Sequence, residues 1–125
     1  MMKNPRLAIF MLLAALAAML IFNHSTSLVG TVRDPEGRPI PGAELHLEVH
    51  LKGSWDGKRV RAKDDGTFKL KVSHPRREIG NPFFVRAAGF KQLSTTLPDA
   101  FRGSMDIVLA PHDSDEKSRF TLEPR

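Results

Sequence analysis

The sequence predicts an all-β protein, a seven-stranded antiparallel sandwich of Greek-key type preceded by one N-terminal apolar helix. After residue 27, short segments of alternating apolar and polar residues recur roughly every 8 to 12 residues. Gly and Pro residues separate these segments, and no apolar repeat at the helical period follows residue 27. Short strands with this spacing are typical of two antiparallel sheets packed face to face.

The apolar helix is predicted from residues 7–22, which contain no charged or polar side chain and follow Lys3 and Arg6. A helix of this length spans about 24 Å, longer than the apolar part of a typical signal peptide and slightly short of a comfortable bilayer span. We therefore expect residues 1–27 to form an uncleaved signal anchor, with a cleaved signal peptide as the alternative.

The charges before the apolar run also predict topology. Positive residues tend to stay in the cytoplasm, so the remainder of the chain should be exported. We expect a cell-envelope protein that is attached to the inner membrane by a single pass, with its domain in the periplasm or outside. The alternative is secretion to the periplasm after cleavage. In the first case the lipid bilayer is a partner through residues 7–22.

The first predicted strand, residues 28–33, ends in a tight reversal at Asp34-Pro35-Glu36-Gly37. Asp can accept hydrogen bonds from the backbone that follows it, Pro presets φ, and Gly accepts a positive φ. Pro39 and Pro41 then remove two backbone donors and favour an irregular edge segment. The chain is therefore expected to reverse here and enter a second strand after Gly42.

The second strand, residues 43–51, has the clearest alternation in the sequence. Its apolar positions are Ala43, Leu45, Leu47, Val49 and Leu51, and Glu or His lies between them. This pattern predicts an antiparallel strand with one buried face and one exposed face.

The remaining strands are predicted from the same alternation at residues 58–63, 67–72, 83–88, 91–97 and 105–109. A glycine-rich loop at 53–57, a turn at 64–66 and a polar loop at 73–82 separate the earlier ones. The sandwich domain therefore covers residues 28–110. The charged segment after Pro111 has little to bury, which predicts a disordered tail at residues 111–125.

The first turn also carries a family resemblance. The pattern Gly30-x-Val32-x-Asp34-x-x-Gly37-x-Pro39-Ile40-x-Gly42-Ala43-x-Leu45 resembles the opening of the carboxypeptidase regulatory-like domain, a transthyretin-like β-sandwich of bacterial envelope proteins. The resemblance continues at residues 64–68 and 85–90 and covers about residues 28–110. It implies a non-catalytic module, not an enzyme, that serves folding, docking or ligand contact. Together with the predicted membrane segment at residues 7–22, it predicts a membrane-tethered envelope module that mediates protein interaction.

Composition and charge narrow the function classes. Of the 19 basic residues, Lys3 and Arg6 precede the apolar run, whereas all 14 acidic residues follow it, so the remainder carries only +3. The basic residues are interleaved with acids and lack an aromatic platform, which argues against a nucleic-acid partner. No nucleophile elbow or phosphate loop is present, and the chain contains no cysteine. We therefore predict no catalytic residue and no cofactor.

His46, Glu48 and His50 share the exposed face of the second strand, and such side chains can bind a metal ion. Four residues of strand place the two imidazoles about 13 Å apart, too far to bind one ion. Each pair with Glu48 would need partners from another strand. We therefore expect a solvated face and no metal site.

The candidate binding surface combines an aromatic residue with two arginines. Trp55 is the only tryptophan and lies between glycines, and Arg76 and Arg77 lie in the polar loop at 73–82. Aromatic and arginine side chains are enriched at binding hot spots. We expect this surface to bind a protein or carbohydrate partner. The alternative functions are a carbohydrate- or peptide-binding accessory module that works with a separate enzyme, or a purely structural domain.

Overall fold

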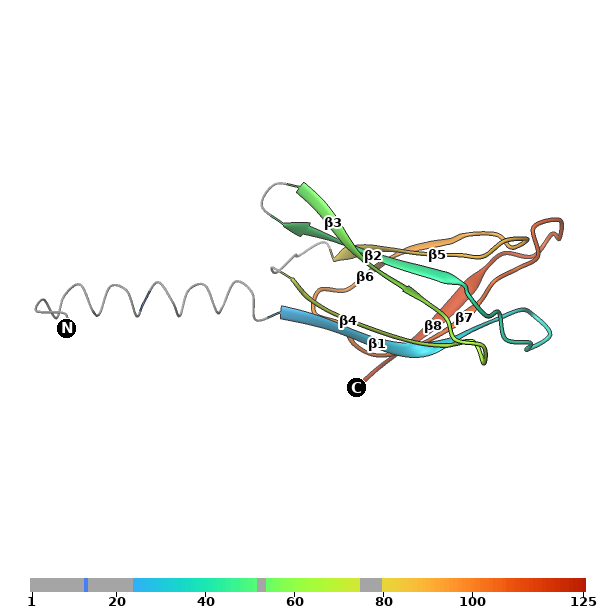
Figure 1. Cartoon of the computed structure of the whole chain (residues 1–125), viewed down its shortest axis with the longest axis horizontal. Coiled ribbons are helices and arrows are strands. Elements are labelled where there is room, and N and C mark those ends of the chain that lie inside the picture. The colour runs from blue at the N-terminus through green and yellow to red at the C-terminus, as the bar shows by residue number, and fades with distance from the viewer. Residues whose placement is uncertain (1–12, 14–23, 52–53, 75–79) are drawn as a thin grey trace, which may run out of the picture.

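The computed structural model describes Leu13 and residues 24–51, 54–74 and 80–125. This part of the chain forms eight strands in two four-stranded sheets that face each other (Figure 1). The strands are β1 (His24–Arg33), β2 (Glu44–Leu51), β3 (Ser54–Arg61), β4 (Thr67–His74), β5 (Asn81–Arg86), β6 (Leu93–Leu97), β7 (Arg102–Val108) and β8 (Arg119–Pro124).

The two sheets differ in how their strands pair. One has the order β4-β1-β7-β8, here called the β1 sheet, and the other has the order β3-β2-β5-β6, here called the β2 sheet. All pairs of the β2 sheet are antiparallel, whereas β1 and β7 of the β1 sheet run parallel. The all-β class and the sandwich are therefore confirmed.

The prediction of seven antiparallel strands is corrected on two points. The described part of the chain has an eighth strand, and the pair formed by β1 and β7 is parallel. Alternation within a segment predicts which side chains share a face, but it carries no information on which distant strand will pair with it. The predicted N-terminal helix lies at residues that are not described, apart from Leu13, and stays a prediction.

The core lies between the sheets and follows the alternation of the strands. Leu45, Leu47 and Val49 of β2 are buried, and the Glu and His residues between them are partly exposed. The predicted buried face of β2 is thus confirmed for these residues. Leu28, Val32, Leu70, Phe83, Met105 and Ile107 supply most of the rest of the core from the other strands.

The predicted reversals are present and depend on glycine. The amide of Gly37 donates to the carbonyl of Asp34 over 2.9 Å, and Gly37 has a φ of 85°. Gly66 closes the second turn with a φ of 79°, and a Cβ at this position would lie 2.6 Å from the carbonyl oxygen of Val32. Both positions therefore favour glycine for the conformational reason that the sequence suggested.

The predicted disorder of residues 111–125 is wrong. Strand β8 pairs antiparallel with β7, and its alternate residues Phe120 and Leu122 pack against the core. The segment before β8 is held by Lys91, whose ammonium donates to two backbone carbonyls of that segment, and by Ser118, whose hydroxyl donates to the carbonyl of Lys91 over 2.7 Å. The charged residues after Pro111 are followed by a short amphipathic strand, β8, which the composition of residues 111–125 did not indicate.

The described residues include no helix that is long and apolar enough to cross a membrane. Residues 7–22 fall outside this finding except for Leu13, whose side chain is exposed. The predicted anchor stays a prediction. Strand β1 begins at His24, so residues 24–27 belong to the first strand of the sandwich and not to the segment before it.

Candidate functional site

One pocket, of about 240 Å³, lies on the outer face of the β2 sheet. Its lining consists of Glu44, His46, Arg59, Phe84, Arg86 and Gln92, and we call it the aromatic pocket. Strands β2, β3 and β5 supply the first five residues, and Gln92 immediately precedes β6. Because the side chains of a strand alternate, the burial of Leu45 and Leu47 turns Glu44 and His46 outward into this pocket.

His46 is the central residue of the aromatic pocket. Its cross-strand partners are Arg59 on β3 and Phe84 on β5. The imidazole and the phenyl ring have centroids 6.2 Å apart and are tilted by 45°. On the other side the imidazole lies over Gly57, where a Cβ would be 2.0 Å from Nε2. The missing side chain at Gly57 therefore leaves room for the ring of His46.

The charges of the aromatic pocket are only partly compensated. Arg86 Nη2 donates to Glu44 Oε1 over 3.1 Å, and the Arg86 side chain is 63% exposed. Arg59 is exposed and has no acidic partner among the described residues. The pocket thus carries one ion pair and one guanidinium that is open to a ligand.

These groups suit a particular ligand chemistry. A guanidinium binds carboxylates and other oxyanions with paired hydrogen bonds, and a phenyl ring favours edge or offset contact with another ring. An apolar cavity of about 150 Å³ holds a benzene molecule, so the aromatic pocket has room for one substituted ring. The arrangement therefore fits a small aromatic compound with an acidic group.

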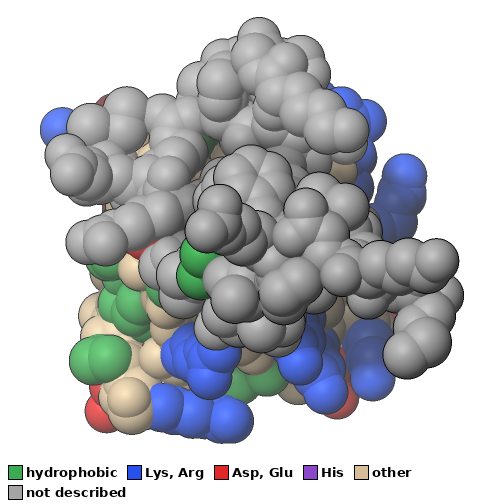
Figure 2. All heavy atoms as spheres, turned by 90° about the vertical axis from the view of Figure 1, so that its left-hand side faces the viewer, with side chains coloured by type: hydrophobic (Ala, Val, Ile, Leu, Met, Phe, Trp, Pro, Cys, Tyr) green, Lys and Arg blue, Asp and Glu red, His purple; other side chains and the backbone are tan. Residues whose placement is uncertain are grey.

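A second pocket, of about 430 Å³, lies on the outer face of the β1 sheet. Its lining consists of Ser25, Ser27, Lys71, Arg102, Gly103 and Arg125, and we call it the basic pocket. In the register of the sheet, Lys71 and Arg102 are the direct neighbours of Ser27 on its two sides. Figure 2 shows Lys and Arg side chains gathered on the lower side of the end at which β1 begins, where Figure 1 places the β1 sheet.

The structure does not test the surface predicted from Trp55, Arg76 and Arg77. Trp55 lies in β3, opposite His50 of β2, rather than in the predicted loop, and its side chain is not described. Arg76 and Arg77 lie in residues 75–79, which are outside the described part. The surface remains a prediction.

Sequence reasoning missed both pockets. His46 was read as part of a solvated face, and Arg59 and Phe84 were not connected with it because they lie far away in sequence. The local signal was the outward position of His46 beside an apolar strand face. The sequence does not show the strand register, which places Phe84 and Arg59 on the two sides of His46.

Metal ligands are not assembled in the described part of the chain, which contains no group of three or more His, Cys, Asp or Glu residues that would suit an ion. The chain has five histidines, and His24, His50 and His74 have side chains that are not described. Glu48 and His46 therefore have no third described partner.

Comparison with known proteins gives the fold. Neither a family model nor a curated protein matches the chain. Among solved structures, it is similar to hydroxyquinol 1,2-dioxygenase from Pseudomonas putida, with a TM-score of 0.55, 16% identity and coverage of 71% of this chain and 57% of that one. It is also similar to wild-type catechol 1,2-dioxygenase from Acinetobacter radioresistens, with a TM-score of 0.53, 16% identity and coverage of 77% and 56%.

A third similar structure is chlorocatechol 1,2-dioxygenase from Pseudomonas putida, with a TM-score of 0.51, 15% identity and coverage of 80% of this chain and 60% of that one. The chain thus spans between 56% and 60% of the length of these enzymes. At this identity the likeness shows a shared fold.

These comparisons contradict the family assigned from the sequence. The similar structures are dioxygenases, not carboxypeptidase regulatory-like or transthyretin-like domains. The predictions of a non-catalytic interaction module and of no enzyme fall with that assignment, because the proteins that share the fold are enzymes. The residues from Gly30 to Leu45 report a strand, a turn and a second strand, a combination that different sandwiches can share.

Proposed function

We propose that the protein binds a small aromatic compound with an acidic or phenolic group in the aromatic pocket and acts on that compound as an enzyme. The observation that carries this proposal is the convergence of Phe84, His46 and the guanidinium of Arg59, which pairs with no described acidic residue, on one pocket. Glu44 and His46 are groups that can accept or donate a proton beside a bound ring. The catechol and hydroxyquinol in the names of the structural neighbours belong to this class of compound.

Three contacts would hold such a ligand. The ring would lie against Phe84, its acidic group would accept hydrogen bonds from Arg59, and a hydroxyl would reach Glu44 or His46. The ion pair of Arg86 with Glu44 would keep the Glu44 carboxylate in position. A ligand with one negative charge suits the pocket, because Glu44 and Arg86 already balance each other.

The binding test compares ligands that separate the two contributions. Hydroxybenzoate carries both an aromatic ring and a carboxylate. Catechol and benzyl alcohol carry the ring without a charge near pH 7, and cyclohexanecarboxylate carries the charge without the aromatic ring. We expect hydroxybenzoate to bind most tightly in calorimetric titrations of the full chain. Chemical-shift changes should centre on His46 and Phe84.

Two variants of β3 provide the control. Arg59→Gln should weaken hydroxybenzoate binding roughly 10- to 150-fold, the range for loss of a charge-assisted hydrogen bond. Arg61→Gln removes a neighbouring exposed cation that does not line the pocket, and should leave binding unchanged. Equal losses in both variants, or no binding of any of the four compounds, would overturn the proposal.

The fold comparison favours a dioxygenase as the specific reaction. A dioxygenase transfers both atoms of O₂ to its substrate, so oxygen uptake must equal substrate loss. Chemistry with O₂ is normally carried by a metal or an organic cofactor. A metal ion would need ligands in addition to the described residues, because these contain no group of three metal-binding side chains.

Oxygen uptake with catechol tests this reaction directly. Purified full-length protein should be assayed as isolated and after incubation with Fe²⁺, Cu²⁺ or flavin, with oxygen and catechol followed together. Equal consumption of both, abolished by Arg59→Gln but not by Arg61→Gln, supports a dioxygenase that uses the aromatic pocket. If no oxygen is taken up under any of these conditions, the proposed dioxygenase activity is overturned. The titrations then decide whether the aromatic pocket binds a ligand.

The proposed cellular location of the protein rests on its sequence alone. We propose that residues 7–22 attach the protein to the membrane and that the sandwich lies on the non-cytoplasmic side. A periplasm-active reporter fused after Arg125 should then be active and a cytoplasm-specific reporter silent. A mature N-terminus near Leu28 on protein sequencing would instead identify a cleaved signal peptide.

A further inference from the structure

The basic pocket is built by one row of residues across the β1 sheet. Lys71, Ser27 and Arg102 lie side by side on β4, β1 and β7, and the amide of Arg125 donates to the carbonyl of Arg102 over 2.9 Å. Neighbouring strands are about 4.8 Å apart, so the row places three cations within about 15 Å.

The cationic side chains of this row have no acidic side-chain partner among the described residues. The described lining of the basic pocket contains three cationic side chains and no acidic side chain, and no described Asp or Glu forms an ion pair with them. Arg102 Nη2 donates over 3.0 Å to the hydroxyl of Ser25, a neutral acceptor. Like charges close together repel one another, so an anion bound between these side chains would reduce their repulsion.

The position of the row relates it to the apolar segment. Only Asn23 and His24 separate Phe22, the last residue of the apolar run, from Ser25 in the pocket. Three residues of fully extended chain span at most about 11 Å. The headgroup layer of a bilayer is roughly 5 to 8 Å thick on each side of the hydrocarbon. A membrane that receives residues 7–22 therefore has its headgroups at the level of this pocket.

We propose that the basic pocket binds the phosphate headgroup of an anionic phospholipid and so holds the β1 sheet at a fixed orientation on the membrane surface. The inference rests on the membrane attachment proposed above and not on the ligand of the aromatic pocket. Arg102 and Lys71 would donate to phosphate oxygens, and the hydroxyls of Ser25 and Ser27 would complete the site. The aromatic pocket, on the outer face of the other sheet, would then point away from this contact.

The test uses the full chain in lipid nanodiscs. One set contains only phosphatidylcholine, and the other also contains phosphatidylglycerol; both carry a headgroup-attached gadolinium chelate. Paramagnetic relaxation of the Lys71 and Gly103 amides reports how closely the row approaches the headgroups. We expect relaxation several-fold stronger in the phosphatidylglycerol discs, and a loss of that difference in about 0.5 M NaCl, where charges are screened beyond roughly 4 Å.

A pair of double variants separates this site from general attraction of the positive domain. Lys71→Gln/Arg102→Gln should reduce the relaxation to the level seen in phosphatidylcholine. Arg33→Gln/Arg119→Gln removes two exposed cations from the far end of the same sheet and should keep it. Both variants should melt at the wild-type temperature, since all four side chains are at the surface.

Each remaining outcome is decisive. Equal relaxation in the two kinds of disc, or equal losses in the two double variants, overturns the lipid site while membrane attachment stands. Failure of the protein to co-elute with either disc overturns both the attachment and the lipid site.

Discussion

The imidazole of His46 lies over Gly57 of the neighbouring strand, so closely that a Cβ on Gly57 would be 2.0 Å from its Nε2. Gly57 is not among the glycines with a positive φ, so its backbone can accept alanine. We expect Gly57→Ala to displace the imidazole while the sheet persists. Hydroxybenzoate binding should weaken several-fold, and the melting temperature should change little because the site is exposed.

The measurement is the NMR shift of the His46 ring together with calorimetric titration. Lys58→Ala, at the next residue of β3 and also exposed, is the matched control and should leave both readings unchanged. An unchanged imidazole shift in Gly57→Ala would mean that the ring does not lie over Gly57.

The second prediction concerns the two faces of β2. Leu47 is fully buried in the core, whereas its neighbour His46 faces the aromatic pocket. Leu47→Ala should lower the free energy of unfolding by about 2 to 5 kcal/mol. His46→Ala should lower it by no more than about 0.5 kcal/mol, because it removes a surface side chain. Denaturant titrations of both variants check this, and a reversed order of the two losses would place β2 one residue out of register.

The third prediction concerns β8, the strand that was not predicted from the sequence. Leu122 of β8 lies opposite Met105 of β7 and is partly buried against the core. Leu122→Ser should lower the free energy of unfolding by roughly 1 kcal/mol, as expected for losing a half-buried leucine. Glu123→Gln, at the exposed neighbour, should have no effect. Identical stability of the two variants, with rapid amide exchange at Leu122, would mean that residues 111–125 are disordered, as the sequence predicted.

These residues show what the sequence could predict. The alternation from Ala43 to Val49 identified the buried face of β2, and the Asp34 and Gly37 pair identified a reversal, because both features depend on neighbours in the chain. Leu122 was missed because the charged residues before it dominated the composition of the tail. Its partner Met105 lies in another strand, so only the fold places the two side chains together.

The candidate sites were less predictable than the strands. The aromatic pocket depends on the register between β2, β3 and β5, and the basic pocket on the parallel pairing of β1 with β7. No local pattern encodes either relationship. The family assignment failed for the same reason, because its most specific residues describe a turn that a protein with another strand order can also use.

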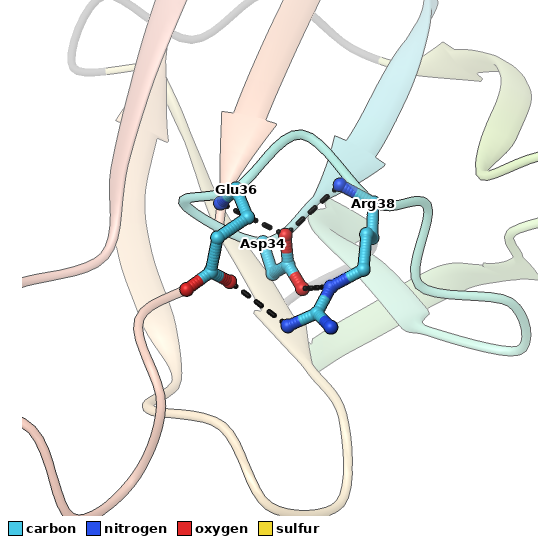
Figure 3. Close-up of polar contacts among 3 residues, drawn as sticks. All are labelled: Asp34, Glu36 and Arg38. Carbon is cyan, nitrogen blue, oxygen red and sulfur yellow. Dashed lines mark hydrogen bonds and ion pairs between the residues drawn. The ribbon is translucent and has the colours of Figure 1, made fainter.

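The last prediction concerns the turn at Asp34, which Figure 3 shows in detail. One carboxylate oxygen of Asp34 accepts the amides of Glu36 and Arg38 over 3.0 and 2.9 Å, and the other accepts Arg38 Nε over 2.8 Å. Burial alone would raise the pKa of Asp34, but these hydrogen bonds and the charge of Arg38 outweigh it and hold the pKa below its usual value of 3.8.

A carboxyl group whose pKa is lower in the folded state than in the unfolded state stabilises the fold when it is ionised. This contribution is complete well above pH 3.8 and is lost as the pH falls through the lowered value. Wild-type stability should therefore fall below about pH 4, and Asp34→Asn should show a shallower fall.

Asp65 should account for a separate part of this loss of stability in acid. Its pKa is lowered by hydrogen bonds from the hydroxyl and amide of Thr67. Denaturant titrations of Asp34→Asn, Asp65→Asn and the double variant between about pH 3 and 7 measure these parts. The double variant should have the flattest profile, and an acid profile that stays as steep as the wild type in all three would show that neither turn carboxylate contributes.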